Sequence, residues 1–229
     1  MNRVKTEAII YKLLTYSDRS AIGFLFTREY GVIKVFISRA FGKKGGVFKF
    51  LPGTVDFLLK ESSGLHKFYG FEPNIKYYFF IENPYILVRL NLIFKLLDEF
   101  GLDYEHNNLL WKMILGIRND NIYKSTVYIT YFILKHSGFL SEINCYECGK
   151  KRDLLLQDDG TVKCKKCCAG TGIVIEDKIV DLFKLLENAR KYKATHIDKR
   201  LEKLYMNYIK NVVTQTLKKS FKVFDILYI

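Results

Sequence analysis

Hydrophobic positions in the first eighty residues fall into short runs rich in β-branched and aromatic side chains, a composition that favours strands. Gly, Pro, Ser and Asp, which favour turns, separate the runs. In the third run Ile33, Val35 and Ile37 share one face, while Val32 and Phe36 make the other face apolar as well. We predict five strands, over residues 6–14, 21–27, 32–38, 54–60 and 67–76.

The hydrophobic spacing changes to a helical period at Asn83, which suits an N-cap, with Pro84 at the first helical position. Apolar residues then recur every three or four positions up to Phe100, and Gly101 is suited to ending the helix. Similar apolar stripes, which we interpret as core, mark further helices. We predict these helices over residues 109–117, 122–135, 179–189 and 201–217.

Four of the five cysteines form two Cys-x2-Cys pairs, Cys145 with Cys148 and Cys164 with Cys167, separated by residues 149–163. Each short turn can direct two sulfurs at one ion, so this spacing is typical of four-thiolate zinc sites. Four sulfur ligands leave no open coordination position, and we predict one structural Zn²⁺. An iron–sulfur cluster and reduced cysteines without metal are the alternatives.

The remaining cysteine, Cys168, is interpreted as a small buried residue or as a competitor of Cys167 for the ion. Together these patterns predict an α+β protein. Residues 1–80 would form a five-stranded OB-type β-barrel that binds DNA, although an SH3-like barrel would give nearly the same pattern. Residues 81–229 would form an α-helical domain with a zinc-binding insert at about residues 140–172.

The chain is strongly basic: 37 Lys and Arg stand against 24 Asp and Glu, a net charge of +13. The excess is +7 in residues 1–80 and +5 in residues 173–229. Such an excess favours polyanionic partners, which are DNA, RNA or an acidic membrane surface, although an ordinary basic protein can also carry it. No targeting segment or membrane-spanning run is recognisable, so we expect a cytoplasmic protein in a reducing compartment.

Cations, glycines and aromatic rings are combined between the third and fourth predicted strands. Cations can neutralise phosphates and an exposed ring can stack on an unpaired base. We therefore predict a DNA-binding loop; a hairpin with solvated lysines and buried phenylalanines fits the same residues. The candidate DNA contacts here are Arg39, Phe41, Lys43, Lys44 and Lys49. Further candidates are Arg19 in the first turn and, near the C-terminus, Arg190, Lys191 and Lys193.

No catalytic motif is recognisable in the sequence. The histidines, at positions 66, 106, 136 and 196, lie far apart without metal-ligand spacing. No nucleophile elbow, phosphate-binding glycine loop or zinc-protease motif occurs. We expect that the protein is not an enzyme.

Five segments carry a resemblance to a known family: residues 16–20, 25–33, 51–53, 134–149 and 216–220. In this order along the chain they resemble segments of the RecO family of bacterial DNA-repair proteins. The most specific is the helix end at Gly138, followed by a short link and the first cysteine pair. The family's basic Gly-Ala-Arg-Arg loop is replaced by residues 38–42, and basic residues arrive later, at Lys43 and Lys44.

The resemblance implies a recombination mediator. Members of the family bind single- and double-stranded DNA and anneal complementary strands. With RecR they help load RecA onto strands coated by the single-stranded-DNA-binding protein. The resemblance thus implies these partners, none in the membrane, and a nucleoid-associated location. A nucleic-acid-processing enzyme with a structural zinc knuckle and a zinc-ribbon transcription accessory protein are the alternative functions.

Overall fold

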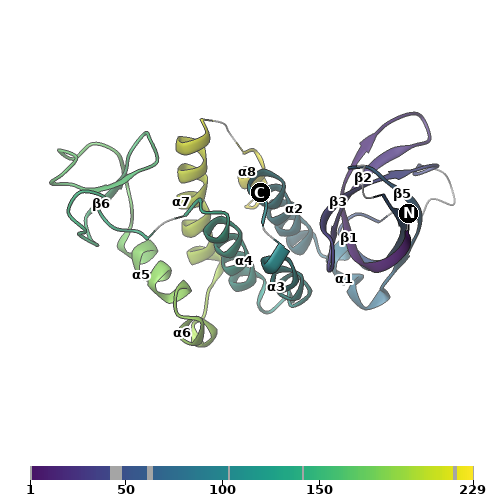
Figure 1. The fold of residues 1–229 in the computed structure, drawn as a ribbon. Coiled ribbons are helices and arrows are strands. Elements are labelled where there is room, and N and C mark those ends of the chain that lie inside the picture. Colours follow the sequence, from purple (N-terminus) through teal and green to yellow (C-terminus); the bar gives the residue numbers. More distant parts are fainter. Residues whose placement is uncertain are drawn as a thin grey trace. The chain divides into compact units, whose positions relative to one another are not determined.

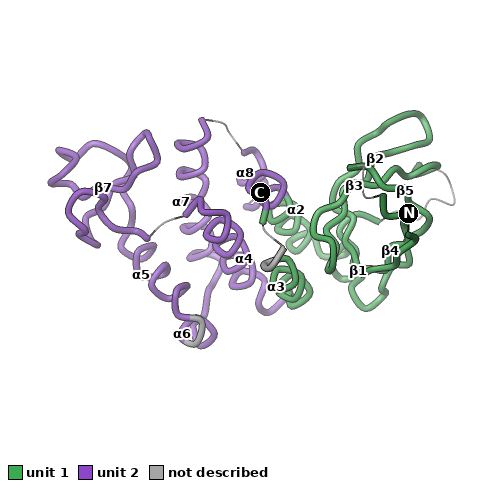
Figure 2. Tube along the Cα trace, viewed as in Figure 1, with its two compact units in different colours: residues 1–94, 102–117 green, residues 95–101, 118–229 purple. Residues whose placement is uncertain are grey.

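The structure is a computed structural model that describes residues 2–41, 48–60, 64–102, 104–140, 142–218 and 221–228. It is an α+β protein, as predicted, with five strands first and mainly helices after them (Figure 1). The chain divides into two compact units, residues 1–94 with 102–117 and residues 95–101 with 118–229 (Figure 2). The predicted division at residue 80 separates strands from helices, whereas the first compact unit also contains helical residues.

The first unit is built on a five-stranded sheet closed into a ring in the order β1-β2-β3-β5-β4. Neighbouring strands are antiparallel, except that β3 and β5 are parallel. The first strand is long enough to pair with β4 through residues 2–9 and with β2 through residues 8–15. A register shift between Ile10 and Lys12 marks a bulge, which lets this strand bend between its two partners. The strands are β1 Asn2–Thr15, β2 Ala21–Thr27, β3 Gly31–Ile37, β4 Pro52–Leu59 and β5 His66–Pro73.

Alternating side chains fill the interior of the ring, because successive residues of a strand point to opposite faces. In β3, the predicted face of Ile33, Val35 and Ile37 is buried, whereas Val32 and Lys34 are exposed. The other buried residues of this core are Ala8, Ile10, Ala21, Leu25, Ala40, Val55 and Phe57. The outward-facing side chains of β1, β2 and β3 are therefore available to pack against other elements.

Helices cover part of this outward-facing side. The Phe94 ring of α2 stacks on Tyr11 of β1 at 4.8 Å between centroids, and Trp111 of α3 lies 6.0 Å from Phe26 of β2. The predicted N-cap of α2 is confirmed, since Asn83 Oδ1 accepts the backbone N–H of Tyr85 at 2.9 Å. These elements are the 3₁₀ helix η1 Ile75–Tyr77 and the helices α1 Phe79–Glu82, α2 Pro84–Phe100 and α3 Tyr104–Leu115.

The second unit combines helices with a small sheet in the order β7-β6-β8. Its aromatic core centres on Phe183 of α5, which contacts Tyr131 of α4 and both Tyr205 and Tyr208 of α7. The helix predicted over residues 179–189 is wrong at its end, because α5 stops at Leu186 and a new helix begins after Asn188. The elements are α4 Ile122–His136, β6 Leu154–Leu156, β7 Val162–Cys164, β8 Ile173–Val174, α5 Asp177–Leu186, α6 Ala189–Ala194, α7 Lys199–Leu217 and α8 Val223–Ile226.

No helix in the described part of the chain is long and apolar enough to cross a membrane.

Candidate metal centre and nucleic-acid interface

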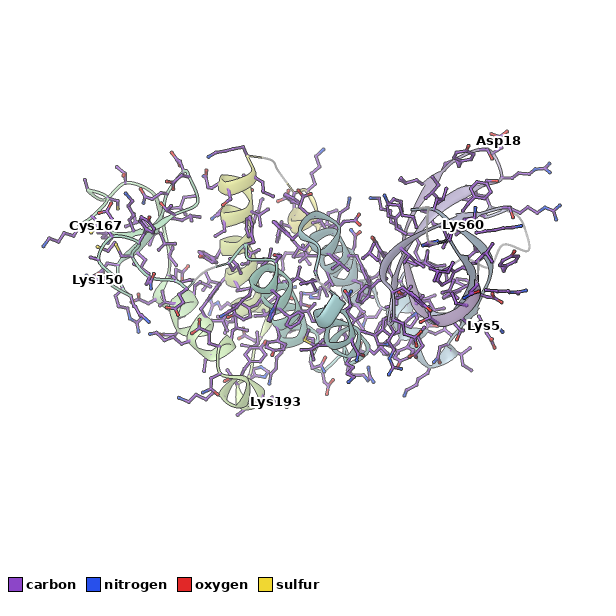
Figure 3. The ribbon with its side chains drawn as sticks, viewed as in Figure 1. Lys5, Asp18, Lys60, Lys150, Cys167 and Lys193 are labelled. Atoms are coloured by element: carbon purple, nitrogen blue, oxygen red, sulfur yellow. The ribbon has the colours of Figure 1, made fainter. Side chains whose placement is uncertain are left out.

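Four cysteine side chains converge in the second unit, as the sequence predicted. The Sγ atoms of Cys145, Cys148, Cys164 and Cys167 all lie within 4.8 Å of one another (Figure 3 labels Cys167). Cys148 Sγ and Cys164 Sγ are 3.7 Å apart. Sulfurs bound tetrahedrally to an ion at about 2.3 Å lie about 3.8 Å apart, so the spacing fits a metal centre. Cys168 is half-buried and is not part of this group.

Each cysteine pair sits on a tight backbone turn. In the first turn, the N–H of Gly149 donates to the carbonyl of Cys145 at 2.8 Å, and Gly149 has a φ of 72°, which glycine adopts readily. In the second, the N–H of Cys167 donates to the carbonyl of Cys164 at 2.9 Å. Cys164 ends β7, so the small sheet positions the second turn against the first. We call these turns the first and second knuckles.

Backbone hydrogen bonds favour the thiolate form of the two buried cysteines. Burial opposes ionisation of Cys145, but backbone N–H groups, first that of Cys164, lower its pKa to about 6. The N–H of Cys167 likewise lowers the pKa of Cys164, against the effect of burial. Thiolates are the form that binds metal ions. The pKa values of the other two cysteines are raised: the backbone N–H of Lys150 lowers that of Cys148, but the neighbouring thiols outweigh it, and the thiols of Cys164 and Cys148 raise that of Cys167. A bound cation would stabilise all four thiolates together.

The segment that carries the knuckles is tied to two helices of the same unit. Arg152 forms ion pairs with Asp177 at 3.3 Å and Asp181 at 3.0 Å, both on α5. Lys218, at the end of α7, donates a hydrogen bond to the carbonyl of Asp158 in the turn between β6 and β7. A change at the metal centre is therefore transmitted to α5 and α7.

Gly160 in the same turn gives a direct test of this attachment. A Cβ at this position would lie 2.3 Å from Thr216 Oγ1 on α7, and its φ is 84°. We expect Gly160→Ala to destabilise the protein by about 2–4 kcal/mol, because it combines left-handed backbone strain with a steric clash. The matched control is Gly170→Ala, with a φ of 78° and open space around the Cβ, which should lose only about 1–2 kcal/mol. Thermal unfolding followed by circular dichroism measures both; equal losses would show that the contact with α7 is unimportant.

In the first unit, the helices leave part of the outward-facing side of β1, β2 and β3 uncovered. This part combines cations with aromatic rings. Phe24 of β2 is flanked by two lysines on the neighbouring strands. The Nζ atoms of Lys12 and Lys34 lie 4.5 and 5.4 Å from the centre of its ring. The next row across the three strands is apolar and consists of Leu14, Ile22 and Phe36.

Tyr16 follows this row in the turn after β1. Its side chain is 67% exposed, and its ring meets Phe36 edge-on at 5.5 Å with an interplanar angle of 89°. Because two perpendicular rings meet edge to face, at least one face of the Tyr16 ring is free of Phe36. We call the set Lys12, Leu14, Tyr16, Ile22, Phe24, Lys34 and Phe36 the outer sheet face; its rings and cations are suited to an unpaired, charged strand.

The structure describes some of the residues that the sequence predicted as DNA contacts. Arg39 and Phe41 are exposed, and Lys49 is exposed with its Nζ 5.2 Å from the ring centre of buried Phe50. Lys43 and Lys44 lie outside the described residues. The exposed ring of Phe41 agrees with the prediction of a DNA-binding loop. The buried ring of Phe50 agrees with the alternative, a hairpin with buried phenylalanines.

The remaining predicted contacts lie on different units. Arg19 is exposed in the turn between β1 and β2, next to Asp18, which Figure 3 labels. Lys191 and Lys193 are exposed on α6, and Figure 3 labels Lys193. Arg190 is also in α6, but its side chain lies outside the described part.

Sequence reasoning did not identify Lys12, Tyr16, Lys34 and Phe36 as one surface. The signal that could have found it is the apolar second face of the third predicted strand, because a wholly solvated face would be polar.

No family model matches the chain, and no curated protein matches it.

Proposed function

We propose that this protein is a DNA-binding recombination mediator of the RecO type, which binds single- and double-stranded DNA and anneals complementary strands. The observation that carries the proposal is the outer sheet face, where lysines flank a ring and an exposed tyrosine follows. The ordered segments that resemble the family and the +7 charge of residues 1–80 support it. In this proposal the closed five-stranded ring is an OB-type barrel, whose strands β2 and β3 commonly bind nucleic acid.

The chemistry of the outer sheet face suits a single strand better than a duplex. Lys12 and Lys34 can neutralise phosphates, which gives affinity without sequence preference. An open face of the Tyr16 ring can stack on a base, and only an unpaired base offers a free face. Arg19 and Arg39, both exposed near the ends of the same strands, would extend the electrostatic contact to the flanking phosphates.

The ion of the four-cysteine centre is inferred to be Zn²⁺. A set of four thiolates in two knuckles matches the structural zinc sites of ribbons and knuckles, and zinc needs no further ligand there. The residues that would hold it are Cys145, Cys148, Cys164 and Cys167. Its contribution is to fold the segment between α4 and α5, not to activate a substrate.

The resemblance extends the proposal to the protein's partners. RecR and the single-stranded-DNA-binding protein would bind directly, and RecA would be loaded as a result, in the nucleoid of the cytoplasm. No nucleotide or open metal position is needed, because annealing requires binding and alignment of strands rather than bond cleavage.

Strand annealing across a salt series tests the proposed function. We expect complementary oligonucleotides to anneal faster with the protein than without it, with an effect that decreases steeply as salt rises, because each phosphate contact to a single strand adds roughly −0.7 to the salt slope. A parallel incubation of labelled DNA with a divalent metal tests for cleavage. Absence of binding and annealing at low salt, or cleavage products, would refute the proposal.

A further inference from the structure

An exposed aromatic ring lies inside the first knuckle, between two metal ligands. Tyr146 is 79% exposed, more than any other large hydrophobic side chain in the described part of the chain. Among those same residues its ring meets no other ring and no cation, and its hydroxyl has no hydrogen-bond partner. Packing therefore does not account for a tyrosine at this position.

Several lysines lie in the two knuckles or directly beside them in the chain. Lys150 and Lys163 are occupied in ion pairs with Asp153 at 2.6 Å and Glu147 at 2.7 Å. In contrast, three further exposed lysines form no ion pair with the described residues. They are Lys151, Lys165 and Lys166.

The two knuckles are built alike, and their cysteine sulfurs meet at one point. Lys165 stands in the second knuckle where Tyr146 stands in the first, directly after the leading cysteine. The N–H of Tyr146 donates to the carbonyl of Val162 at 2.8 Å, and the N–H of Lys165 donates to the carbonyl of Asp153 at 2.9 Å. Each residue is one peptide, about 3.8 Å of chain, from a cysteine whose sulfur lies within 4.8 Å of the others.

The backbone at both positions is therefore held before any ligand arrives. A preformed surface loses little conformational entropy on binding, so even a small contact area can contribute affinity. A ring with open faces next to unpaired cations is the combination that binds unpaired nucleotides, by stacking and by phosphate contact. An acidic protein segment would use the lysines but would gain little from a solvent-exposed ring.

We propose that Tyr146, Lys151, Lys165 and Lys166 form a second binding site for single-stranded DNA, here called the knuckle surface. It lies on the second unit and is distinct from the outer sheet face of the first unit. The inference rests on the proposed function and extends it: a protein that anneals two strands gains from holding one strand on each unit. The metal ion would then order a nucleic-acid contact in addition to stabilising the fold.

Counting the strands bound per chain tests this site. Full-length, metal-loaded protein is titrated with a short oligothymidine at low salt, and we expect two strands per chain. The variant Tyr146→Ala/Lys165→Ala/Lys166→Ala should bind one strand at the same concentrations, because the second site weakens roughly 10- to 100-fold on loss of a stacked base and two phosphate contacts. Its annealing should slow by a similar factor. The matched control is Tyr85→Ala, which removes a 59% exposed tyrosine from α2 in the first unit.

Metal content and circular dichroism establish that the variant is folded. Photocrosslinking with 5-iodouracil strands gives a direct second readout, because it should label Tyr146 in the wild-type protein. If the wild-type protein binds no DNA, the proposed function itself fails. If it binds and anneals DNA but the triple variant keeps the same stoichiometry and rate, or Tyr146 is not labelled, the knuckle surface is refuted while the outer sheet face stands.

Discussion

Replacing Cys145 by serine is expected to abolish metal binding and to unfold the second unit. Cys145 is buried, with a 1% exposed side chain, and its knuckle contacts β7 through the hydrogen bond from Tyr146 to Val162. Structural zinc sites couple binding free energies of order 10 kcal/mol to folding, so the loss of one ligand should lower stability by roughly 3 kcal/mol or more. The ion pairs from Arg152 to α5 would be lost with the knuckle segment.

The first unit provides an internal reference for this experiment. Trp111, the only tryptophan in the sequence, is buried in the first unit, so its emission should stay constant while helical circular dichroism decreases. Treatment of the wild-type protein with a chelator should reproduce the effect.

The matched control is Cys168→Ser, because Cys168 adjoins the centre but is not part of the converging group. It should keep its metal content and its unfolding temperature. A Cys145→Ser protein with normal metal content and normal stability would contradict the assignment of this ligand.

Features that depend on residues close together in the chain could be predicted from the sequence. The convergence of the four cysteines was predicted, because the spacing within each Cys-x2-Cys pair already directs two sulfurs to the same side of a tight turn. The helix start at Asn83 was equally local, since the capping side chain and the N–H groups that it accepts are neighbours in the chain.

The parts that depend on distant residues were not predicted. The first strand begins at Asn2 rather than at residue 6, because β4 pairs with its early residues. The predicted helix over residues 179–189 divides because Asn188 accepts the N–H of Lys191 and so starts a new helix, a competition that apolar spacing does not reveal.

The outer sheet face also depends on residues that are distant in the chain, so the sequence did not predict it. Lys12, Phe24 and Lys34 come from three strands and meet only through the register of β1, β2 and β3. A single sequence gives the alternation along each strand but not the pairing between strands. The predicted contacts consequently concentrated on a loop whose residues are adjacent in the chain.

Removing the cations and the ring of the outer sheet face should weaken single-strand binding at that face roughly 100-fold at low salt, because the variant Lys12→Ala/Tyr16→Ala/Lys34→Ala loses one stacked base and two phosphate contacts there. The salt slope should fall by about 1.4 for the same two contacts. Tyr16→Ala alone should weaken binding of single strands but leave duplex binding unchanged, since a duplex offers no free base face. Fluorescence anisotropy with labelled single and double strands measures all three effects.

Tyr69→Ala is the matched control for the loss of Tyr16. Tyr69 is 45% exposed, but Arg3 and Lys67 lie over its ring at 4.5 and 5.2 Å, so a base would have to compete with these cations for the ring. We expect its removal to leave single-strand affinity within about twofold, whereas removal of Tyr16 should lower it at least fivefold, the lower limit for a stacked base. Equal effects of the two substitutions would mean that general charge, not stacking on an open ring, governs binding. The strand would then follow the basic residues from Arg39 to Lys49 instead.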